Sequence, residues 1–242
     1  MKLQPNIKLN MADNMHKPVL IVIAGPNGSG KTTITSRILQ HEWLEDSIYI
    51  NPDNVAQQKF GDWNNQEAVL KAAQYCQEQR EECLKSKHSM IFETVMSTDE
   101  KINFIQKAKE AGFYIRLFFV GTASPTINAS RIAASVMKGG HDVPISKIIS
   151  RYAKSIINCG IASQYADRTY VYDNSTEGVE AQLLFRMTDG KVFKSDVTEL
   201  LQTCMSELYG GDYSSYFERF GSAYSAMETW EQMRRKSLMH LV

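Results

Sequence analysis

The segment from Gly25 to Thr32, GPNGSGKT, constrains the fold of this chain more than any other stretch. It matches the pattern G-x-x-x-x-G-K-[ST] at every fixed position, and that pattern forms a glycine-rich loop whose backbone N–H groups surround a phosphate. The apolar run before it, residues 19–24, predicts a buried parallel strand. Ile34 and Ile38 have helical spacing after it. The order of strand, glycine loop and helix predicts a triphosphate-binding P-loop.

Each residue type in this loop has a task in nucleotide binding. Lys31 is expected to reach the β- and γ-phosphates, and the Thr32 hydroxyl is expected to bind Mg²⁺. The start of the following helix adds a favourable dipole for the anion. No N-K-x-D signature for guanine occurs in the chain, which favours ATP over GTP. The residues expected to bind the nucleotide are Gly25, Pro26, Asn27, Gly28, Ser29, Gly30, Lys31, Thr32 and Thr33.

Further short apolar runs predict strands that alternate with helical segments. They lie at residues 47–50, 89–92, 115–120 and 169–172. Strands joined by helical crossovers form a parallel sheet between helices. The turn signal Asp189-Gly190 between two later apolar runs predicts a hairpin. We therefore expect an α/β fold: a three-layer αβα P-loop NTPase with a five-stranded, mostly parallel sheet, followed by a C-terminal hairpin and helices.

Length and composition favour one main domain with an addition at each end. The chain has 242 residues, of which 43% are hydrophobic, so it can bury one substantial core. Residues 1–17 are polar and aperiodic and predict a loose leader. We expect the P-loop domain at 18–194, with a lid around 124–163. Residues 195–242 carry two amphipathic patterns and predict a helical extension packed on or beside the core.

Charge and cysteine usage restrict the class of partner. Lys plus Arg and Asp plus Glu both number 27, so net charge gives no reason to expect nucleic acid as a partner. The 4 cysteines show neither a C-x-x-C pair nor metal-ligand spacing. No stretch approaches the ~18 apolar residues of a membrane span. These features favour a cytoplasmic protein without a membrane partner.

Two carboxylates follow predicted strands and are candidates for chemistry. Asp53 comes after the 47–50 strand, at the rim where open α/β sheets place their active sites, and is suited to accept a proton from a substrate hydroxyl. Its structural alternative is a turn or helix cap after Pro52. Glu93 ends the 89–92 strand and is suited to bind Mg²⁺ through water or to grip a substrate hydroxyl. The alternative for Glu93 is a solvated strand end.

A cationic helix and the loop after it predict a lid. Arg131 and Lys138 lie on one helical stripe, Gly-Gly-His141 follows, and the next helix carries Arg151. A stripe of this kind is usually just a solvated helix face, but the loop after it is typical of the lids of small kinases. Lids bring cations to the transferring phosphate and exclude water. Asn174, after the 169–172 strand, is placed near the adenine end of the nucleotide.

Taken together, these motifs resemble the zeta-toxin family of P-loop kinases. The resemblance runs from about residue 18 to 192, and the Gly-Gly-His-Asp-Val-Pro run followed by Arg-Tyr is its most specific part. The segments that carry it are Gly25–Thr33, Asn51-Pro52-Asp53, Phe92-Glu93-Thr94, Gly121-Thr122-Ala123, Arg131, Gly139–Pro144, Arg151-Tyr152 and Asp173-Asn174-Ser175.

The resemblance implies an adenylate-kinase-like fold and an ATP-dependent kinase that uses Mg²⁺. It further implies phosphorylation of the 3′-hydroxyl of UDP-N-acetylglucosamine, with Asp53 as the base and Lys31 as the phosphate-binding lysine. Arg131 matches an arginine that binds the γ-phosphate. An antitoxin protein is implied as a partner by the family alone. The residues matched to the sugar-nucleotide acceptor are Glu93, Thr94 and Asn51.

The chain also departs from the family pattern. Ser135 stands where members often carry a second basic residue, and a lid arginine is missing near His141. This leaves open whether Lys138 or His141 supplies that charge. Two other functions therefore stay open: a kinase of another small molecule or of a nucleic-acid 5′-hydroxyl, and an NTP-binding regulatory module with little turnover.

Overall fold

The computed structural model describes residues 17–40, 46–61, 64–140, 142–188 and 191–192. Most of the expected leader, the whole expected helical extension, the hairpin turn Asp189-Gly190 and the lid residue His141 lie outside the described residues. Within these ranges, no helix has both the length and the apolar character needed to cross a membrane.

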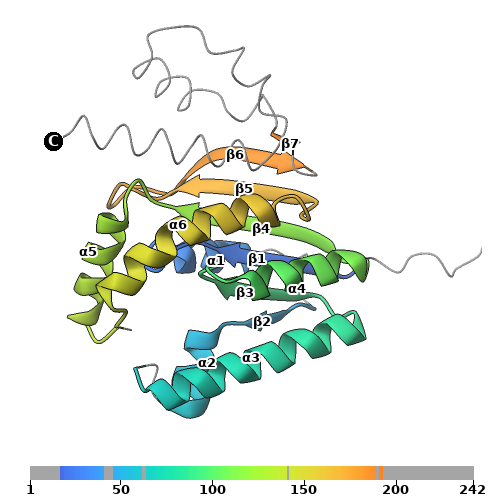
Figure 1. The fold of residues 1–242 in the computed structure, drawn as a ribbon, viewed down its shortest axis with the longest axis horizontal. Helices are drawn as coiled ribbons and strands as arrows, with labels where there is room; N and C mark the ends of the chain where they lie inside the picture. Colours follow the sequence, from blue (N-terminus) through green and yellow to red (C-terminus); the bar gives the residue numbers. More distant parts are fainter. Residues whose placement is uncertain (1–16, 41–45, 62–63, 141, 189–190, 193–242) are drawn as a thin grey trace, which may run out of the picture.

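Seven strands form a single sheet at the centre of the molecule (Figure 1). In chain order they are β1 (Val19–Ala24), β2 (Ile48–Ile50), β3 (Met90–Thr94), β4 (Tyr114–Gly121), β5 (Arg168–Asp173), β6 (Gln182–Thr188) and β7 (Lys191–Val192). Their spatial order is β2-β3-β1-β4-β5-β6-β7. Neighbouring strands from β2 to β5 are parallel, so their carboxyl ends meet at one edge of the sheet.

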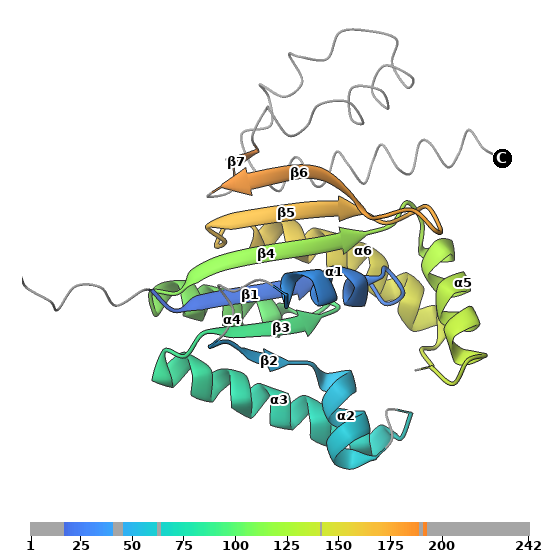
Figure 2. The ribbon, with the colours of Figure 1, turned by 180° about the vertical axis from the view of Figure 1, so that it is seen from behind.

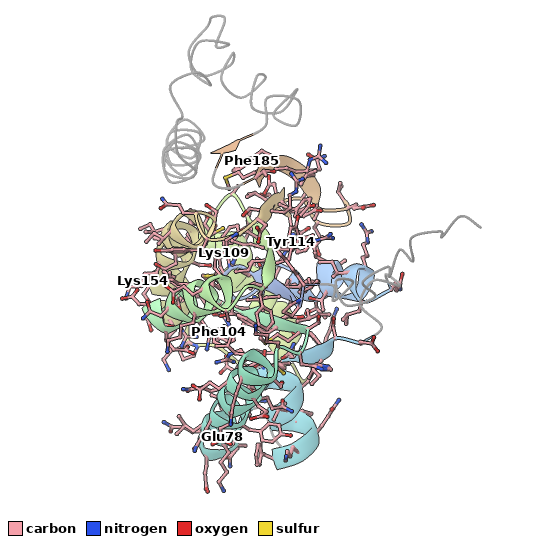
Figure 3. The ribbon with its side chains drawn as sticks, turned by 90° about the vertical axis from the view of Figure 1, so that its right-hand side faces the viewer. Glu78, Phe104, Lys109, Tyr114, Lys154 and Phe185 are labelled. Carbon is pink, nitrogen blue, oxygen red and sulfur yellow. The ribbon has the colours of Figure 1, made fainter. Side chains whose placement is uncertain are left out.

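Helices cover both faces of this sheet. Their bounds are α1 (Lys31–Ile38), α2 (Pro52–Phe60), α3 (Gln66–Ser86), α4 (Asp99–Glu110), α5 (Pro125–Val136) and α6 (Ile145–Ala162). Helices α3, α4 and α6 lie on the face toward the viewer in Figure 1, and α1 lies on the opposite face, which Figure 2 shows. The side view separates these layers (Figure 3). The expected three-layer αβα architecture is confirmed.

The core has two parts, one on each side of the sheet. The larger part packs Cys76 of α3, Phe104 of α4 and Ile156 of α6 against the strands. The smaller part packs Ile34 and Ile38 of α1 against the other face. Strand β1 contributes alternate residues to both parts, because a central parallel strand is covered on both sides. Its continuous apolar sequence is therefore required by its position.

The hairpin extends the sheet, which differs from our expectation of a five-stranded sheet with a separate hairpin. Strand β6 pairs antiparallel with β5, and β7 pairs antiparallel with β6. Leu184, Phe185 and Met187 of β6 are buried in the larger core. Without β6, strand β5 would expose a row of unpaired backbone groups at the sheet edge. Pairing these groups and burying the apolar side chains accounts for the longer sheet.

Candidate active site

The P-loop lies at the carboxyl end of the central strand β1 and leads directly into α1, as predicted. Lys31 is the first residue of α1, and its ammonium donates hydrogen bonds to the carbonyls of Gly25 at 2.9 Å and Pro26 at 3.1 Å. Burial lowers the pKa of Lys31, whereas the negative charges of Glu93 and Asp53 oppose that shift. Both candidate carboxylates, Asp53 and Glu93, therefore act electrostatically on the lysine.

The loop has the properties of a polyphosphate site. The side-chain oxygens Asn27 Oδ1 and Ser29 Oγ are buried and have no hydrogen-bond partner among the described residues. Thr32 and Thr33 are exposed in the first turn of α1, where helix N–H groups lack intrahelical partners. The Ser29 hydroxyl is a buried donor without a partner, and with the Lys31 ammonium and the helix N-terminus it fits an anionic ligand rich in acceptors. The loop residues present therefore fit a bound triphosphate.

Glu93 is the centre of a hydrogen-bond network next to the P-loop. It is the fourth residue of β3 and is only 9% exposed. Its Oε1 accepts hydrogen bonds from Thr35 Oγ1 at 2.5 Å and from the Tyr49 hydroxyl at 2.7 Å. Burial, followed by the contact with Glu93, raises the pKa of Tyr49, so the phenol remains a donor. Glu93 is thus held in place by α1 and β2, and the alternative of a solvated strand end is wrong.

Asn51 and Asp53 form the start of α2. The Asn51 side chain accepts hydrogen bonds from the backbone N–H of Asp53 at 2.9 Å and of Asn54 at 3.2 Å, and Pro52 occupies the first turn. The amide of Asn51 also donates to the Tyr49 hydroxyl at 2.9 Å. Asp53 is exposed, and its charge acts on Lys31. Asn51 therefore couples the Glu93 network to the helix turn that presents Asp53.

Thr94, expected to bind the acceptor, lies at the end of β3 beside the P-loop. Its carbonyl accepts a hydrogen bond from the N–H of Gly25 at 3.2 Å. Its hydroxyl accepts one from the N–H of Met96 at 3.0 Å, in a turn where Met96 adopts a φ of 55°. The backbone contact of Thr94 therefore ties β3 to the phosphate loop. Its contact with an acceptor stays a prediction.

Arg131 holds the loop after β5. Its guanidinium donates to the carbonyls of Asn174 at 2.7 Å and Ser175 at 3.4 Å. The side chain of Asn174 in turn donates to the carbonyl of Ser29 at 2.8 Å. Arg131 and Asn174 are thereby connected to the P-loop from its outer side. The expected contacts of Arg131 with the γ-phosphate and of Asn174 with adenine stay predictions.

The remaining lid candidates lie farther from this network. Lys138 is exposed just after α5, and Arg151 is half-buried on α6. Across the part of the chain that the structure describes, neither side chain forms a hydrogen bond or ion pair with the P-loop. The loop between the two helices contacts the segment before α3 instead, because the N–H of Asp142 donates to Asn64 Oδ1 at 3.0 Å. The lid role of Lys138, His141 and Arg151 stays a prediction.

Sequence reasoning missed three residues that form a chain of hydrogen bonds ending at the P-loop. Asn128 of α5 is fully buried and donates to the carbonyl of Asn27 at 2.7 Å. The Thr122 hydroxyl donates to Asn128 Oδ1, and the Tyr152 hydroxyl donates to the carbonyl of Thr122 at 2.5 Å. Asn128 lies in a helix whose pattern gives no reason to select it. Thr122 and Tyr152 belong to segments that carry the family resemblance, but no chemical role was assigned to them.

Comparison with known sequences identifies relatives of this chain. The family model described as Zeta toxin matches residues 6–179. An uncharacterized protein of Haemophilus influenzae is 31% identical over 132 residues, which correspond to 54% of this chain and 91% of that protein. The matched family region contains every residue of the site described above.

Solved structures share the fold. One comes from the PezAT chromosomal toxin–antitoxin system of Streptococcus pneumoniae, with a TM-score of 0.53, 16% identity and coverage of 92% of this chain and 88% of that chain. Another is the AvrRxo1-ORF1:-ORF2 complex, with a TM-score of 0.55, 17% identity and coverage of 91% and 79%. The same pair with ATP gives a TM-score of 0.55, 16% identity and coverage of 91% and 80%. At these identities the similarity concerns the fold.

Proposed function

Because the chain belongs to the zeta toxin family, we propose that it transfers the γ-phosphate of ATP to a hydroxyl of a sugar nucleotide, with UDP-N-acetylglucosamine as the leading candidate. Family membership and the P-loop identify an ATP-dependent kinase. The acceptor is the part that we propose. One observation supports it most strongly: hydrogen bonds join Glu93 of β3 to α1, the helix that begins with Lys31, and through Tyr49 and Asn51 to the helix turn of Asp53.

On the donor side, the chain's own residues bind and orient the triphosphate. The P-loop amides surround the phosphates, and the Lys31 ammonium exchanges its bonds to the Gly25 and Pro26 carbonyls for phosphate oxygens. The Thr32 hydroxyl at the start of α1 would hold Mg²⁺, which neutralises phosphate charge when bound. The described residues contain no cluster of three or more His, Cys, Asp or Glu suited to a metal ion.

On the acceptor side, Asp53 and Glu93 have different tasks. Asp53 is exposed at the start of α2, so an acceptor hydroxyl can reach its carboxylate and give up its proton as the phosphoryl group arrives. Glu93 is buried, and Thr35 and Tyr49 both donate to its Oε1. We propose that Oε2, which receives neither bond, accepts a hydrogen bond from a second hydroxyl of the acceptor. We propose that Asn51, just after β2, and Thr94, at the end of β3, also contact the acceptor.

The test is a transfer assay with the full-length protein. The chain is incubated with ATP, Mg²⁺ and single sugar nucleotides, and the products are identified by mass spectrometry. We expect a phosphorylated sugar nucleotide, and no product when Mg²⁺ is omitted. Phosphorylation of a different hydroxyl compound alone would disprove the proposed acceptor and leave the kinase assignment intact.

Asp53→Asn tests the proposed base. Removing a general base slows transfer by roughly 10²- to 10⁴-fold, while ATP affinity stays near that of the unchanged protein. Asp46→Asn is the matched control, because Asp46 is exposed and precedes β2 at the opposite edge of the sheet. Equal rates for Asp53→Asn and Asp46→Asn would exclude Asp53 as the base.

We also propose an antitoxin protein as partner and a cytoplasmic location. The similar folds from the PezAT toxin–antitoxin system and the AvrRxo1-ORF1:-ORF2 complex support the partner. The three described cysteines, Cys76, Cys83 and Cys159, are free and buried, as in a reducing compartment. We expect bacterial growth to stop when the chain is expressed alone, but not when it carries Asp53→Asn. Normal growth in both cultures would remove the reason to expect an antitoxin.

A further inference from the structure

Two asparagines hold the outer side of the P-loop. Asn128 of α5 donates its side-chain N–H to the carbonyl of Asn27 at 2.7 Å. Asn174, after β5, donates in the same way to the carbonyl of Ser29 at 2.8 Å. The two carbonyls belong to alternate peptide groups of the loop, and each is bound by one side-chain amide. Both contacts join segments more than 100 residues apart in the chain, at separations of 101 and 145.

The geometry of the peptide group connects these carbonyls to the phosphate site. In a trans peptide the C=O and the following N–H point in opposite directions within one plane, and the described chain contains no cis bond. A carbonyl of Asn27 held outward therefore turns the N–H of Gly28 inward. The same holds for Ser29 and the N–H of Gly30. Neither of these N–H groups donates a hydrogen bond to any described residue.

We propose that Asn128 and Asn174 are positioning residues for ATP binding: they fix two P-loop carbonyls outward so that the N–H groups of Gly28 and Gly30 face the phosphates. This inference uses the proposed function only in taking the loop as the ATP site. An amide already aimed at an anion needs no rearrangement on binding, which is why preorganised donors are effective. The two asparagines would act through the backbone and never touch the nucleotide phosphates.

The glycines opposite the asparagines support this role. Gly28 has a φ of 75°, and a Cβ there would lie 2.6 Å from the carbonyl oxygen of Asn128. Gly30 has a φ of 87°, and a Cβ there would lie 2.2 Å from the side-chain nitrogen of Asn174. Both separations are far shorter than a non-bonded contact allows. The loop is therefore built for close approach of these two asparagines as well as for its backbone conformation.

Each asparagine is itself fixed by contacts outside the loop. The Thr122 hydroxyl donates to Asn128 Oδ1, which orients the amide so that its N–H points at Asn27. The backbone N–H of Asn174 donates to the carbonyl of Gly121 at 2.9 Å, and its carbonyl accepts from Arg131. The orientation of the loop is thus set by α5 and by the ends of β4 and β5. This orientation therefore depends on residues outside the P-loop.

The experiment measures phosphate binding directly. ADP and inorganic pyrophosphate are titrated calorimetrically into the full-length protein and its Asn174→Ala and Asn128→Ala variants. We expect the dissociation constants of both ligands to rise by roughly 10- to 100-fold, the range for losing one hydrogen bond to a charged group. In ¹⁵N spectra, the Gly28 and Gly30 amide signals should shift on ADP binding in the unchanged protein and shift less in each variant.

Asn65→Ala is the control for a purely structural effect. Asn65 caps α3 by accepting hydrogen bonds from the N–H groups of Glu67 at 2.9 Å and Ala68 at 3.1 Å. Its loss should lower the unfolding temperature without changing either dissociation constant. Unchanged affinities in folded Asn174→Ala and Asn128→Ala would overturn the inference. If Asn128→Ala does not fold, the affinities of Asn174→Ala test the inference by themselves, because Asn174 is only half-buried. Absence of ADP binding by the unchanged protein would instead overturn the proposed function.

Discussion

At the scale of single residues, the proposed acceptor site depends on how Glu93 is oriented. Two hydroxyls, from Thr35 and Tyr49, donate to the same carboxylate oxygen, so the side chain has one occupied and one unoccupied oxygen within this network. The amide of Asn51 donates to the Tyr49 hydroxyl and thereby leaves the phenol proton for Glu93. A buried carboxylate with directed donors has a defined orientation, which a substrate-binding group requires.

Tyr49→Phe tests this orientation. The substitution removes the donor to Glu93 while keeping the ring, so we expect kcat/KM for the acceptor to fall about tenfold and stability to fall by about 1 kcal/mol. ATP affinity should not change. Because burial and then the Glu93 contact raise the pKa of Tyr49, the donor is lost only at strongly alkaline pH, and rates near neutrality should not titrate with it.

Tyr114→Phe is the control for Tyr49→Phe. Tyr114, labelled in Figure 3, is half-buried and is the first residue of β4, so it lies at the amino end of that strand. It keeps its ring contact with Arg116 when the hydroxyl is removed. If both variants lose acceptor turnover equally, the Tyr49 bond to Glu93 does not orient the carboxylate.

At the scale of elements, an arginine is buried between α3 and α4. Arg80 of α3 is 2% exposed, and its guanidinium lies 5.3 Å from the ring of Phe92 and 5.6 Å from that of Phe104. Its ion pair is with Glu100 of α4 at 3.1 Å. Glu100 also pairs with Lys101 at 2.5 Å. The charge of Arg80 is removed from water. It is compensated by the ion pair with Glu100 and by the two aromatic rings.

The two partners of this ion pair should differ in how much stability is lost when each one is replaced. Glu100→Gln leaves a buried guanidinium without its counter-ion and should lower the free energy of unfolding by about 1–3 kcal/mol. Arg80→Met removes the charge and keeps an apolar side chain, so we expect a smaller loss. Chemical denaturation measures both. Glu78→Gln, at an exposed position of α3 (Figure 3), should change stability by less than about 0.5 kcal/mol. A larger loss for Arg80→Met than for Glu100→Gln would contradict this account.

At the scale of the whole molecule, the site joins elements from most of the described chain. The P-loop follows β1, Asp53 lies in the first turn of α2 after β2, and Glu93 lies in β3. Helix α5 and the segment after β5 hold the P-loop through Asn128 and Asn174. Binding ATP therefore adds contacts to several elements at once. Since only the folded chain presents this arrangement, ATP should stabilise the entire described domain.

A thermal unfolding series with increasing ATP tests this coupling. At a ligand concentration about 100 times the dissociation constant, stabilisation is about 2.7 kcal/mol. For a chain of this size that raises the unfolding temperature by roughly 5–10 °C. Lys31→Met should show no ATP-dependent shift, because it removes the ammonium that we propose binds the phosphates. An equal shift in Lys31→Met would place ATP elsewhere.

Lys31→Met should also change the pH dependence of the unliganded protein. Burial lowers the pKa of Lys31 below its ordinary 10.5, so the folded chain releases a proton that the unfolded chain still binds. Stability therefore rises as pH increases from the lowered pKa toward 10.5. This rise of stability with pH should be absent in Lys31→Met.

Much of the architecture follows from local sequence patterns. Glycine spacing and Lys31 identify the P-loop, and the apolar runs identify β1, β3, β4 and β5 to within about two residues. Asp53 and Glu93 could be selected because parallel strands bring their carboxyl ends to one edge. The hairpin was recognised, but its pairing with β5 was not, because the edge that a strand pairs with depends on the assembled sheet.

The sequence by itself determined the P-loop and the parallel α/β fold, because a glycine loop after an apolar strand has few other structures available. Only the tertiary structure decided what holds the site. Asn128 reaches Asn27, Asn174 reaches Ser29, and Tyr49 reaches Glu93 across separations of 101, 145 and 44 residues. Asparagine and tyrosine occur in many turns and helices, so their type carries no signal of such contacts. Their role arises from packing, which places one particular side chain within hydrogen-bond distance of one particular backbone or carboxylate oxygen.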